Sequence, residues 1–422
     1  MYTELPLIAA AAVQGAFPET APFRVDQFQV APLAMSALFV AQGILAIGIH
    51  VSAVRQWQRA WWAAVVALLV LTLVFFTLGS WGTSDVTRFS HYLDVDPERA
   101  PPELLWRLLR PLILLLPYRM AALHGLVAAG FAAAPALLAR AWGVPAWAGW
   151  WALLITCSPM LRGFLQNAHT RQALATLLLL PLLLQMARLI RLPWRWLGLG
   201  VGLSALTHNT FVLNLPLSLS PLLLRLPELA ARLRSPSRSS DADTPGALRR
   251  RLMVWGLLLA VLILFLLAAP IALDRFFDYA QDEYFNRYPL RSVVGRLQRA
   301  LFFGLLLGCV QRRLTPLRLL RCPITLLLLL FGLLYIGVQQ SIAHLWLPQI
   351  TSRLADTVAF FLLILYLAWL QRYRATWCVL PALYITLQYW LEGRLLPSGT
   401  LLCGRNDEFL CIPDRWPWQV RF

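Results

Sequence analysis

Long apolar stretches alternate with short polar ones along almost the whole chain. Many of these stretches are about 17 to 25 residues long, enough for an α-helix to cross about 30 Å of hydrocarbon. The pattern predicts about twelve helices, at residues 30–49, 61–79, 119–139, 145–160, 171–187, 196–208, 211–224, 252–270, 298–310, 323–340, 354–370 and 376–391. We therefore expect an all-α, polytopic membrane protein.

The predicted helices form a single transmembrane domain over residues 30–391. Residues 1–29 have no basic residue ahead of their apolar centre, unlike a secretory signal, and are expected to form an outer or interfacial segment. Within the first large outer loop, residues 80–118, the stretch 101–117 has apolar residues at helical spacing. It is typical of a helix that lies in the membrane interface. Residues 392–422 form a predicted outer tail.

The distribution of charge predicts the orientation. The chain has 37 basic residues, all arginine, and 20 acidic ones. The loops predicted on one side of the membrane are basic and hold only three acidic residues, Glu228, Asp241 and Asp243. The positive-inside rule makes this side cytoplasmic, with its longest basic loop at 225–251, and it places both termini outside. Because the arginines are not clustered on a polar face, nucleic acid is not expected as a partner.

Composition further restricts the class of protein, and the cysteine positions restrict where a disulfide can form. With 59% hydrophobic and 14% charged residues, the chain has too little charge for a soluble globular protein. Cys403 and Cys411 lie in the predicted outer tail, where an oxidising exterior permits a disulfide. We find no internal repeat and no Gly-rich phosphate-binding loop.

Polar and ionisable groups gather at the predicted outer ends of four helices. Such groups are costly at membrane depth and usually mark a functional site. They belong to four stretches, "SDVTRFSHY" (Asp85, Arg88, Tyr92), "RGFLQNAHTRQ" (Arg162, Gln166, His169, Arg171, Gln172), "THN" (His208, Asn209) and "SRLAD" (Arg353, Asp356).

Each stretch also has a purely structural interpretation. Asp85 with Arg88, and Arg353 with Asp356, have the spacing of helical ion pairs. His208 can satisfy backbone groups where a helix breaks, and Arg171 can anchor a helix at the interface. The shared location of the four stretches favours a site. Several arginines without an acidic cluster indicate an anion such as phosphate, and no spacing of carboxylates or histidines requires a metal.

These stretches together resemble the EpsG-like branch of the Wzy-type bacterial polysaccharide polymerases. The resemblance rests on Asp85 and Tyr92 in the first outer loop, "TRQALATLLLL" from Thr170, "GLSALTHNTFV" with His208 and "SRLADTVAFF" with Arg353. It implies a fold like the C-type glycosyltransferases in the bacterial plasma (inner) membrane, with the active site facing the periplasm or exterior. It also implies a metal-independent polymerase of exopolysaccharide or O-antigen that uses no cofactor.

The resemblance assigns roles to the candidate residues. The enzyme would join oligosaccharide units carried on polyprenyl pyrophosphate, with the lipid bilayer and a chain-length regulator as further partners. Asp85, His169 or His208 would take the proton of the attacking hydroxyl, with Asp85 preferred by analogy. The implied substrate-binding residues are Arg88, Tyr92, Gln166, Arg171, Gln172, Asn209, Tyr284 and Arg353.

Other functions fit parts of the same pattern. A C-type glycosyltransferase or an O-antigen ligase would use a similar polyprenyl-linked donor but add a single unit. A flippase or transporter for a lipid-linked glycan is a third alternative, but transporters usually have internal pseudo-symmetry and ionisable groups near the bilayer midplane. The tyrosines, finally, also suit an aromatic belt at the interface.

Overall fold

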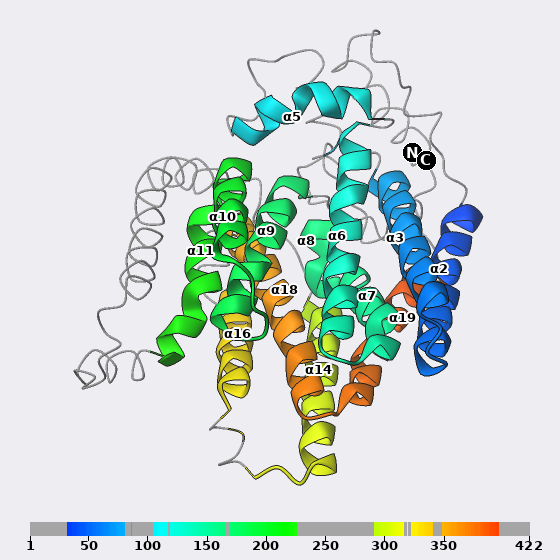
Figure 1. Ribbon diagram of the computed structural model, residues 1–422, viewed down its shortest axis with the longest axis vertical. Helices are drawn as coiled ribbons and strands as arrows, with labels where there is room; N and C mark the ends of the chain where they lie inside the picture. The colour runs from blue at the N-terminus through cyan, green and yellow to red at the C-terminus, as the bar shows by residue number, and fades with distance from the viewer. Residues whose placement is uncertain are drawn as a thin grey trace, which may run out of the picture.

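The computed structural model describes residues 32–80, 86, 104–116, 119–165, 169–225, 291–315, 319, 322–340 and 348–395. Within these ranges the chain is helical and has no strand (Figure 1). The α-helices are α2 (Pro32–Val54), α3 (Gln58–Ser80), α5 (Leu104–Leu115), α6 (Met120–Ala141), α7 (Ala148–Thr156), α8 (Arg162–Leu165), α9 (Thr170–Met186), α10 (Trp194–Thr207), α11 (Phe211–Leu219), α14 (Arg291–Gln311), α16 (Pro323–Gln340), α18 (Pro348–Arg372) and α19 (Leu380–Leu395). Short 3-10 helices adjoin them at η3 (Pro145–Trp147), η4 (Pro159–Leu161), η5 (Ser220–Arg225) and η8 (Thr376–Val379).

The all-α prediction is confirmed for this part of the chain. Four helical stretches are long and apolar enough to cross a membrane, namely Ala37–Val54, Gln58–Leu78, Met120–Ala141 and Arg353–Arg372. The predicted helix at 145–160 is divided instead into η3, α7 and η4. Pro145 and Pro159 begin the two 3-10 helices, because proline lacks the amide hydrogen that a continuous α-helix needs. The predicted helix 252–270 and both termini lie outside the described residues.

Helix α18 forms the centre of the bundle. Its residues from Val358 to Leu370 are buried on every side, which is typical of a core helix. Phe360 packs against Phe131 of α6 with ring centroids 4.4 Å apart. Trp369 donates a 3.1 Å hydrogen bond to the Thr325 hydroxyl of α16. The start of α18, which includes Arg353, is therefore held by a rigid core.

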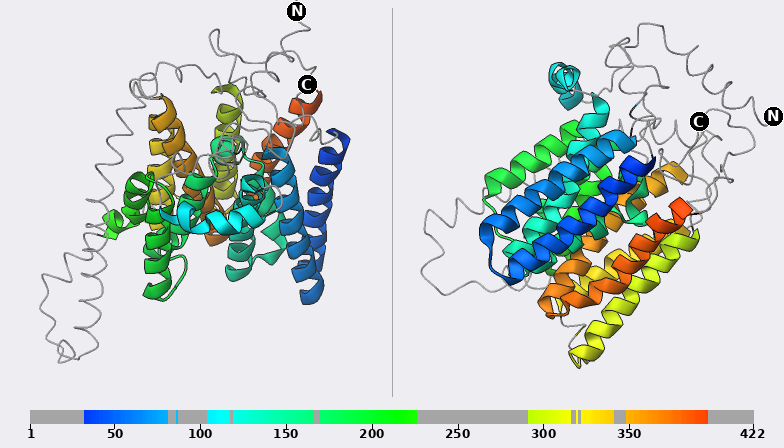
Figure 2. Two further views of the ribbon diagram at one scale, coloured as in Figure 1. Left: turned by 90° about the horizontal axis from the view of Figure 1, so that it is seen from above. Right: turned by 90° about the vertical axis from the view of Figure 1, so that its right-hand side faces the viewer.

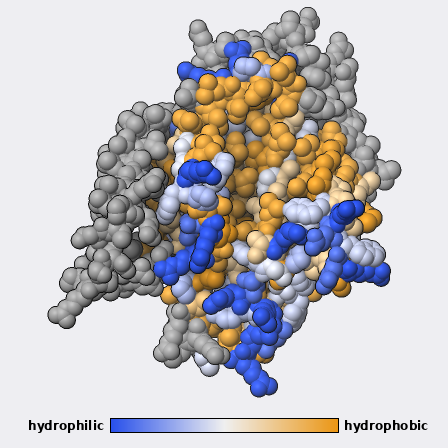
Figure 3. All heavy atoms as spheres, viewed as in Figure 1, coloured by the Kyte–Doolittle hydropathy of each residue, from blue (hydrophilic) through white to orange (hydrophobic). Residues whose placement is uncertain are grey.

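Five helix ends have the same cap, in which one residue has a left-handed backbone conformation. The amide of the next residue bonds back into the last turn, as in the 2.8 Å bond from Leu189 N–H to the Leu184 carbonyl, and this arrangement is the Schellman motif. The left-handed residues are Gln56, Gly143, Arg188, Arg313 and Arg374. All five caps lie toward the lower end of the view in Figure 1, where hydrophilic residues also concentrate in Figure 3. We call this side the arginine-rich end.

Helix α5 lies across the opposite end of the bundle, whereas most other helices run along it (Figures 1 and 2). Trp106 fixes it there by donating a 2.7 Å hydrogen bond to the Thr207 carbonyl at the end of α10. Ile113 is also buried, while Leu112 and Leu115 are exposed. The predicted helix in the first outer loop is thus present, and it is attached one residue away from His208.

Candidate functional site

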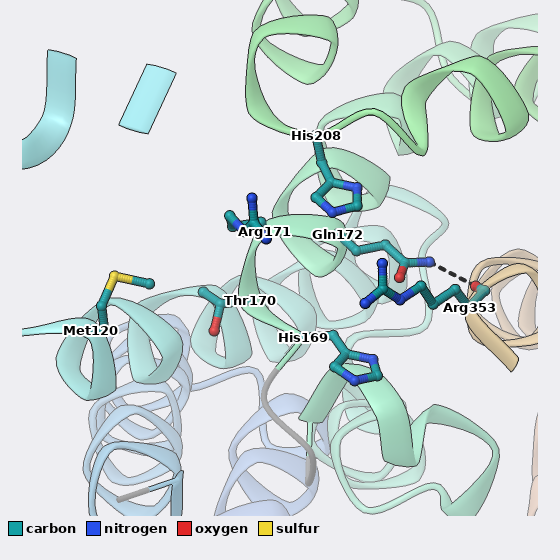
Figure 4. Close-up of a pocket in the computed structure, with 7 residues that line it drawn as sticks. All are labelled: Met120, His169, Thr170, Arg171, Gln172, His208 and Arg353. Atoms are coloured by element: carbon teal, nitrogen blue, oxygen red, sulfur yellow. Dashed lines mark hydrogen bonds between the residues drawn. The ribbon is translucent and has the colours of Figure 1, made fainter. Parts of the chain in front are cut away.

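A pocket opens where α6, α9 and α18 begin and α10 ends. Because α6, α9 and α18 all finish at the arginine-rich end, the pocket lies toward the other end of the bundle. Its wall contains five residues singled out in the sequence, to which the structure adds Met120 and Thr170 (Figure 4). The five are His169, Arg171, Gln172, His208 and Arg353. Tertiary structure thus brings together three of the four polar stretches.

The remaining candidate site residues lie away from the pocket or outside the described residues. Asn209 lies in the turn between α10 and α11, where its carbonyl accepts a 3.2 Å bond from the Val212 amide, and it does not line the pocket. Arg162 begins α8, and nothing is described of its side chain. Five candidates lie outside the described residues, namely Asp85, Arg88, Tyr92, Gln166 and Tyr284.

His124 lies next to the pocket, bonded to one of its lining residues, and was not among the residues predicted from the sequence. Its imidazole is fully buried and lies 3.0 Å from the Leu165 carbonyl through Nε2 and 3.1 Å from the Thr170 hydroxyl through Nδ1. Since a carbonyl only accepts hydrogen bonds, Nε2 carries a proton and donates it. His124 therefore ties the end of α8 to the start of α9. A lone histidine inside an apolar helix was the signal for it.

The tautomer of His208 is set by the turn that follows α10. The backbone amide of Thr210 donates a 3.1 Å hydrogen bond to Nδ1 of His208, and the Thr210 hydroxyl lies 2.9 Å from the same nitrogen. An amide can only donate, so Nδ1 is the acceptor, and the proton of the neutral ring is on Nε2. His208 thus offers a hydrogen-bond donor and is poorly suited to accept a proton. This geometry argues against the predicted role of His208 as a base.

The imidazole of His169 lies beside Gly163. A Cβ atom placed on Gly163 would overlap the carboxylate of Asp356 and would lie 3.1 Å from Nδ1 of His169. The carboxylate and the imidazole therefore meet in front of the bare Cα of Gly163. Asp356 is only 8% exposed and lies one helical turn after Arg353. A carboxylate close to an imidazole favours the protonated ring and so supports a role of the histidine in proton transfer.

Gln172 fastens α9 to α18. Its side-chain Nε2 donates a 2.7 Å hydrogen bond to the Arg353 carbonyl (Figure 4). One turn further along α9, the Thr176 hydroxyl lies 3.3 Å from that of Thr357 and accepts a 3.0 Å bond from Asn214 of α11. These buried bonds hold three helices in register beneath the pocket.

The assembled groups favour an anionic ligand. Arg171 and Arg353 bring two guanidinium groups to one pocket, and His208 adds an N–H donor. Among the described residues there is no group of three His, Cys, Asp or Glu side chains that could hold a metal ion. The free space at the centre is about 10 Å³, roughly one water molecule. A larger anion would therefore require side chains of the pocket wall to move.

No protein family model, curated protein or solved structure matches this chain. Functional inference therefore depends on the chemistry and geometry of the pocket.

Proposed function

We propose that this protein is a glycan polymerase that joins oligosaccharide units carried on polyprenyl pyrophosphate. The observation that supports this most directly is the meeting of Arg171 and Arg353, from helices far apart in the sequence, in a pocket at the ends of apolar helices. Arginine binds phosphate oxygens through two parallel hydrogen bonds. A pocket at this position suits a phosphate group whose lipid tail remains in the bilayer.

The proposed reaction transfers a glycan between two lipid carriers. A hydroxyl oxygen of one lipid-linked unit attacks the anomeric carbon of the growing glycan. The bond between that carbon and the pyrophosphate oxygen breaks, and its electron pair leaves with the lipid pyrophosphate. Arg171, Arg353 and the Nε2–H of His208 would stabilise the charge that develops on this leaving group, which is where preorganised donors lower the barrier most. The N-terminus of α9 adds a favourable dipole.

The same reaction needs a group that takes the proton of the attacking hydroxyl. Among the described residues we assign this role to the imidazole of His169, with the nearby carboxylate of Asp356 as the positioning residue. Gly163 supports this assignment. Because it has no side chain, it leaves room for the Asp356 carboxylate and the His169 imidazole to lie close together. Asp85, preferred from the sequence, lies outside the described residues and remains a prediction.

We further propose that the pocket faces the periplasm or exterior of a bacterial plasma membrane. The arginine-rich end would face the cytoplasm by the positive-inside rule, and the pocket lies at the other end of the same helices. Helix α5, attached beside His208 by Trp106, would lie in the outer interface. Its exposed leucines suit one wall of a sideways path for the polyprenyl tail.

The test is polymerisation by the purified protein. Wild-type protein is incubated with a polyprenyl-pyrophosphate-linked repeat unit, and the glycan is separated on a gel. We expect a ladder of products that is lost in Arg171→Ala and in Arg353→Ala. Arg195→Ala is the matched control, because Arg195 is exposed at the start of α10 and lies away from the pocket.

Thermal unfolding in detergent checks that each variant is folded. A normal ladder from both folded pocket variants would refute the leaving-group role of the arginines. Addition of a single unit by the wild type would instead indicate a transferase or ligase. Transport of the lipid-linked glycan across vesicles without any new glycosidic bond would indicate a flippase.

A further inference from the structure

Gln172 has a buried hydrogen-bond acceptor that an anion cannot satisfy. The side chain is 2% exposed, and its Nε2 faces the Arg353 carbonyl at 2.7 Å. A carbonyl cannot donate a hydrogen bond, so this contact fixes which end of the amide is nitrogen. The oxygen Oε1 therefore faces the other way. It is buried and has no hydrogen-bond partner among the described residues.

This oxygen lies on the pocket side of the amide. Figure 4 shows it turned toward the space between His208 and His169, beside the Arg353 side chain. The charged groups of the pocket wall, the two guanidinium groups, are donors, as is Nε2–H of His208. Oε1 of Gln172 thus introduces an acceptor among donors that suit phosphate oxygens.

This combination of hydrogen-bond donors with one acceptor restricts the chemistry of the ligand. A fully ionised phosphate or pyrophosphate offers only acceptors, so it can satisfy the arginines but leaves Oε1 without a partner. A buried acceptor is expected to find a partner in the functional complex. A ligand that carries an O–H or N–H donor close to its anionic part would satisfy the arginines and Oε1 together.

We propose that Gln172 recognises the sugar that is bonded directly to the pyrophosphate, with Oε1 accepting a hydrogen bond from the hydroxyl or acylamino group at C2. This inference rests on the proposed function and adds the specificity of its donor site. Gln172 follows Arg171 in the chain and bonds to the backbone of Arg353, so its oxygen lies near the groups assigned to phosphate. In a glycosyl phosphate, the C2 substituent is on the carbon next to the one that carries the phosphate. It is therefore the donor best placed to reach Oε1.

The alternative is that Gln172 only fastens α9 to α18. Two variants separate these roles. Gln172→Met keeps the length of the side chain and removes both the acceptor Oε1 and the hydrogen bond from Nε2 to the Arg353 carbonyl. Thr176→Val removes the hydroxyl that links α9 to Thr357 and Asn214 one turn below, and it leaves Gln172 intact. If helix fastening alone matters, both variants should behave alike.

The experiment measures the affinity of detergent-solubilised, full-length protein for three lipids. These are polyprenyl pyrophosphate, the same lipid bearing one sugar with a free 2-hydroxyl, and its 2-deoxy analogue. We expect the wild type to bind the hydroxyl-bearing lipid about tenfold more tightly than either of the others, the effect of one hydrogen bond to a buried group. Gln172→Met should lose this preference and still bind the sugar-free lipid within about twofold of the wild type. Thr176→Val should retain the preference.

Several results would overturn the inference. Equal binding of the three lipids by the wild type would do so, as would an unchanged preference in Gln172→Met or its equal loss in Thr176→Val. A sugar preference that depends on Gln172 in a protein that forms no glycan ladder would support this inference and refute the polymerase. A ladder combined with unchanged discrimination in Gln172→Met would refute only the inference. Failure of all three lipids to bind would refute both.

Discussion

At the scale of single residues, the two pocket histidines differ in the groups that surround each ring. In His208 a backbone amide donates to Nδ1, so Nε2 is a donor. In His169 the imidazole lies close to the Asp356 carboxylate, and both pack against the bare Cα of Gly163. The sequence treats both as candidate bases, because residue type alone does not specify a tautomer. Their surroundings give them opposite proposed roles, one toward the leaving group and one toward the attacking hydroxyl.

Gly163 provides a sharp test of the His169–Asp356 arrangement. In Gly163→Ala the new methyl group would collide with the Asp356 carboxylate and displace it from His169. We expect the rate of polymerisation to fall at least tenfold, since a displaced positioning group leaves the base misoriented. The rate is measured from the growth of the glycan ladder at saturating lipid-linked substrate.

The matched control for Gly163→Ala is Gly202→Ala in α10, where an added Cβ meets no atom within 4 Å. This change should preserve activity and stabilise the helix by up to about 1 kcal/mol. Normal activity in Gly163→Ala would argue against a role for the Asp356 carboxylate at its observed position.

At the scale of elements, the shared helix cap has an energetic cost at four of its five positions. Only Gly143 is a glycine, whereas the other left-handed residues carry a Cβ that crowds the backbone. Tertiary packing and the Schellman hydrogen bonds outweigh this cost. The caps let each helix turn sharply into the next segment, so the loops at the arginine-rich end stay short where they are described.

A glycine at one of these caps should therefore stabilise the protein. We expect Arg313→Gly, at an exposed position with a φ angle of 47°, to raise the free energy of unfolding by about 0.5–1 kcal/mol. Thermal unfolding in detergent measures the change. Arg313→Ala removes the same charge and keeps a Cβ, so it should give no such gain. Equal effects of the two substitutions would show that charge, and not backbone conformation, determines stability there.

At the scale of the whole molecule, charge distribution and pocket position together predict orientation. Reporter fusions test it. We expect a periplasm-dependent phosphatase to be active when it is fused after Phe422, and inactive when it is inserted in the basic loop 225–251. The reverse pattern would place the pocket in the cytoplasm and would contradict the proposed access of a periplasmic substrate.

The proposed chemistry also predicts independence from divalent metals. Two guanidinium groups supply the charge that a metal would otherwise bring to a pyrophosphate leaving group. We expect the glycan ladder to persist in excess EDTA, with no increase when Mg²⁺ or Mn²⁺ is restored. A strict requirement for either ion would refute this mechanism and would direct attention to carboxylates such as Asp85.

The sequence predicted most helices correctly where the structure describes them. The predicted helix at 323–340 matches α16 at both ends, since an apolar run bounded by proline and polar residues is a local signal. The division of 145–160 was missed, because apolar composition outweighed its two prolines in the prediction. His124 was missed because a single histidine gives no spacing to interpret, and its importance comes from Leu165 and Thr170, which are distant along the chain.

The sequence by itself determined the helical class, the apolar segments and the polar residues at their ends, because these follow from hydrophobic transfer and local helix geometry. Only the tertiary structure decided which polar ends meet. It placed Arg353 beside Gln172, Asp356 beside His169 and Thr210 on His208. These relations depend on helix packing and on the direction of individual hydrogen bonds. Such information is non-local, so no pattern along the chain contains it.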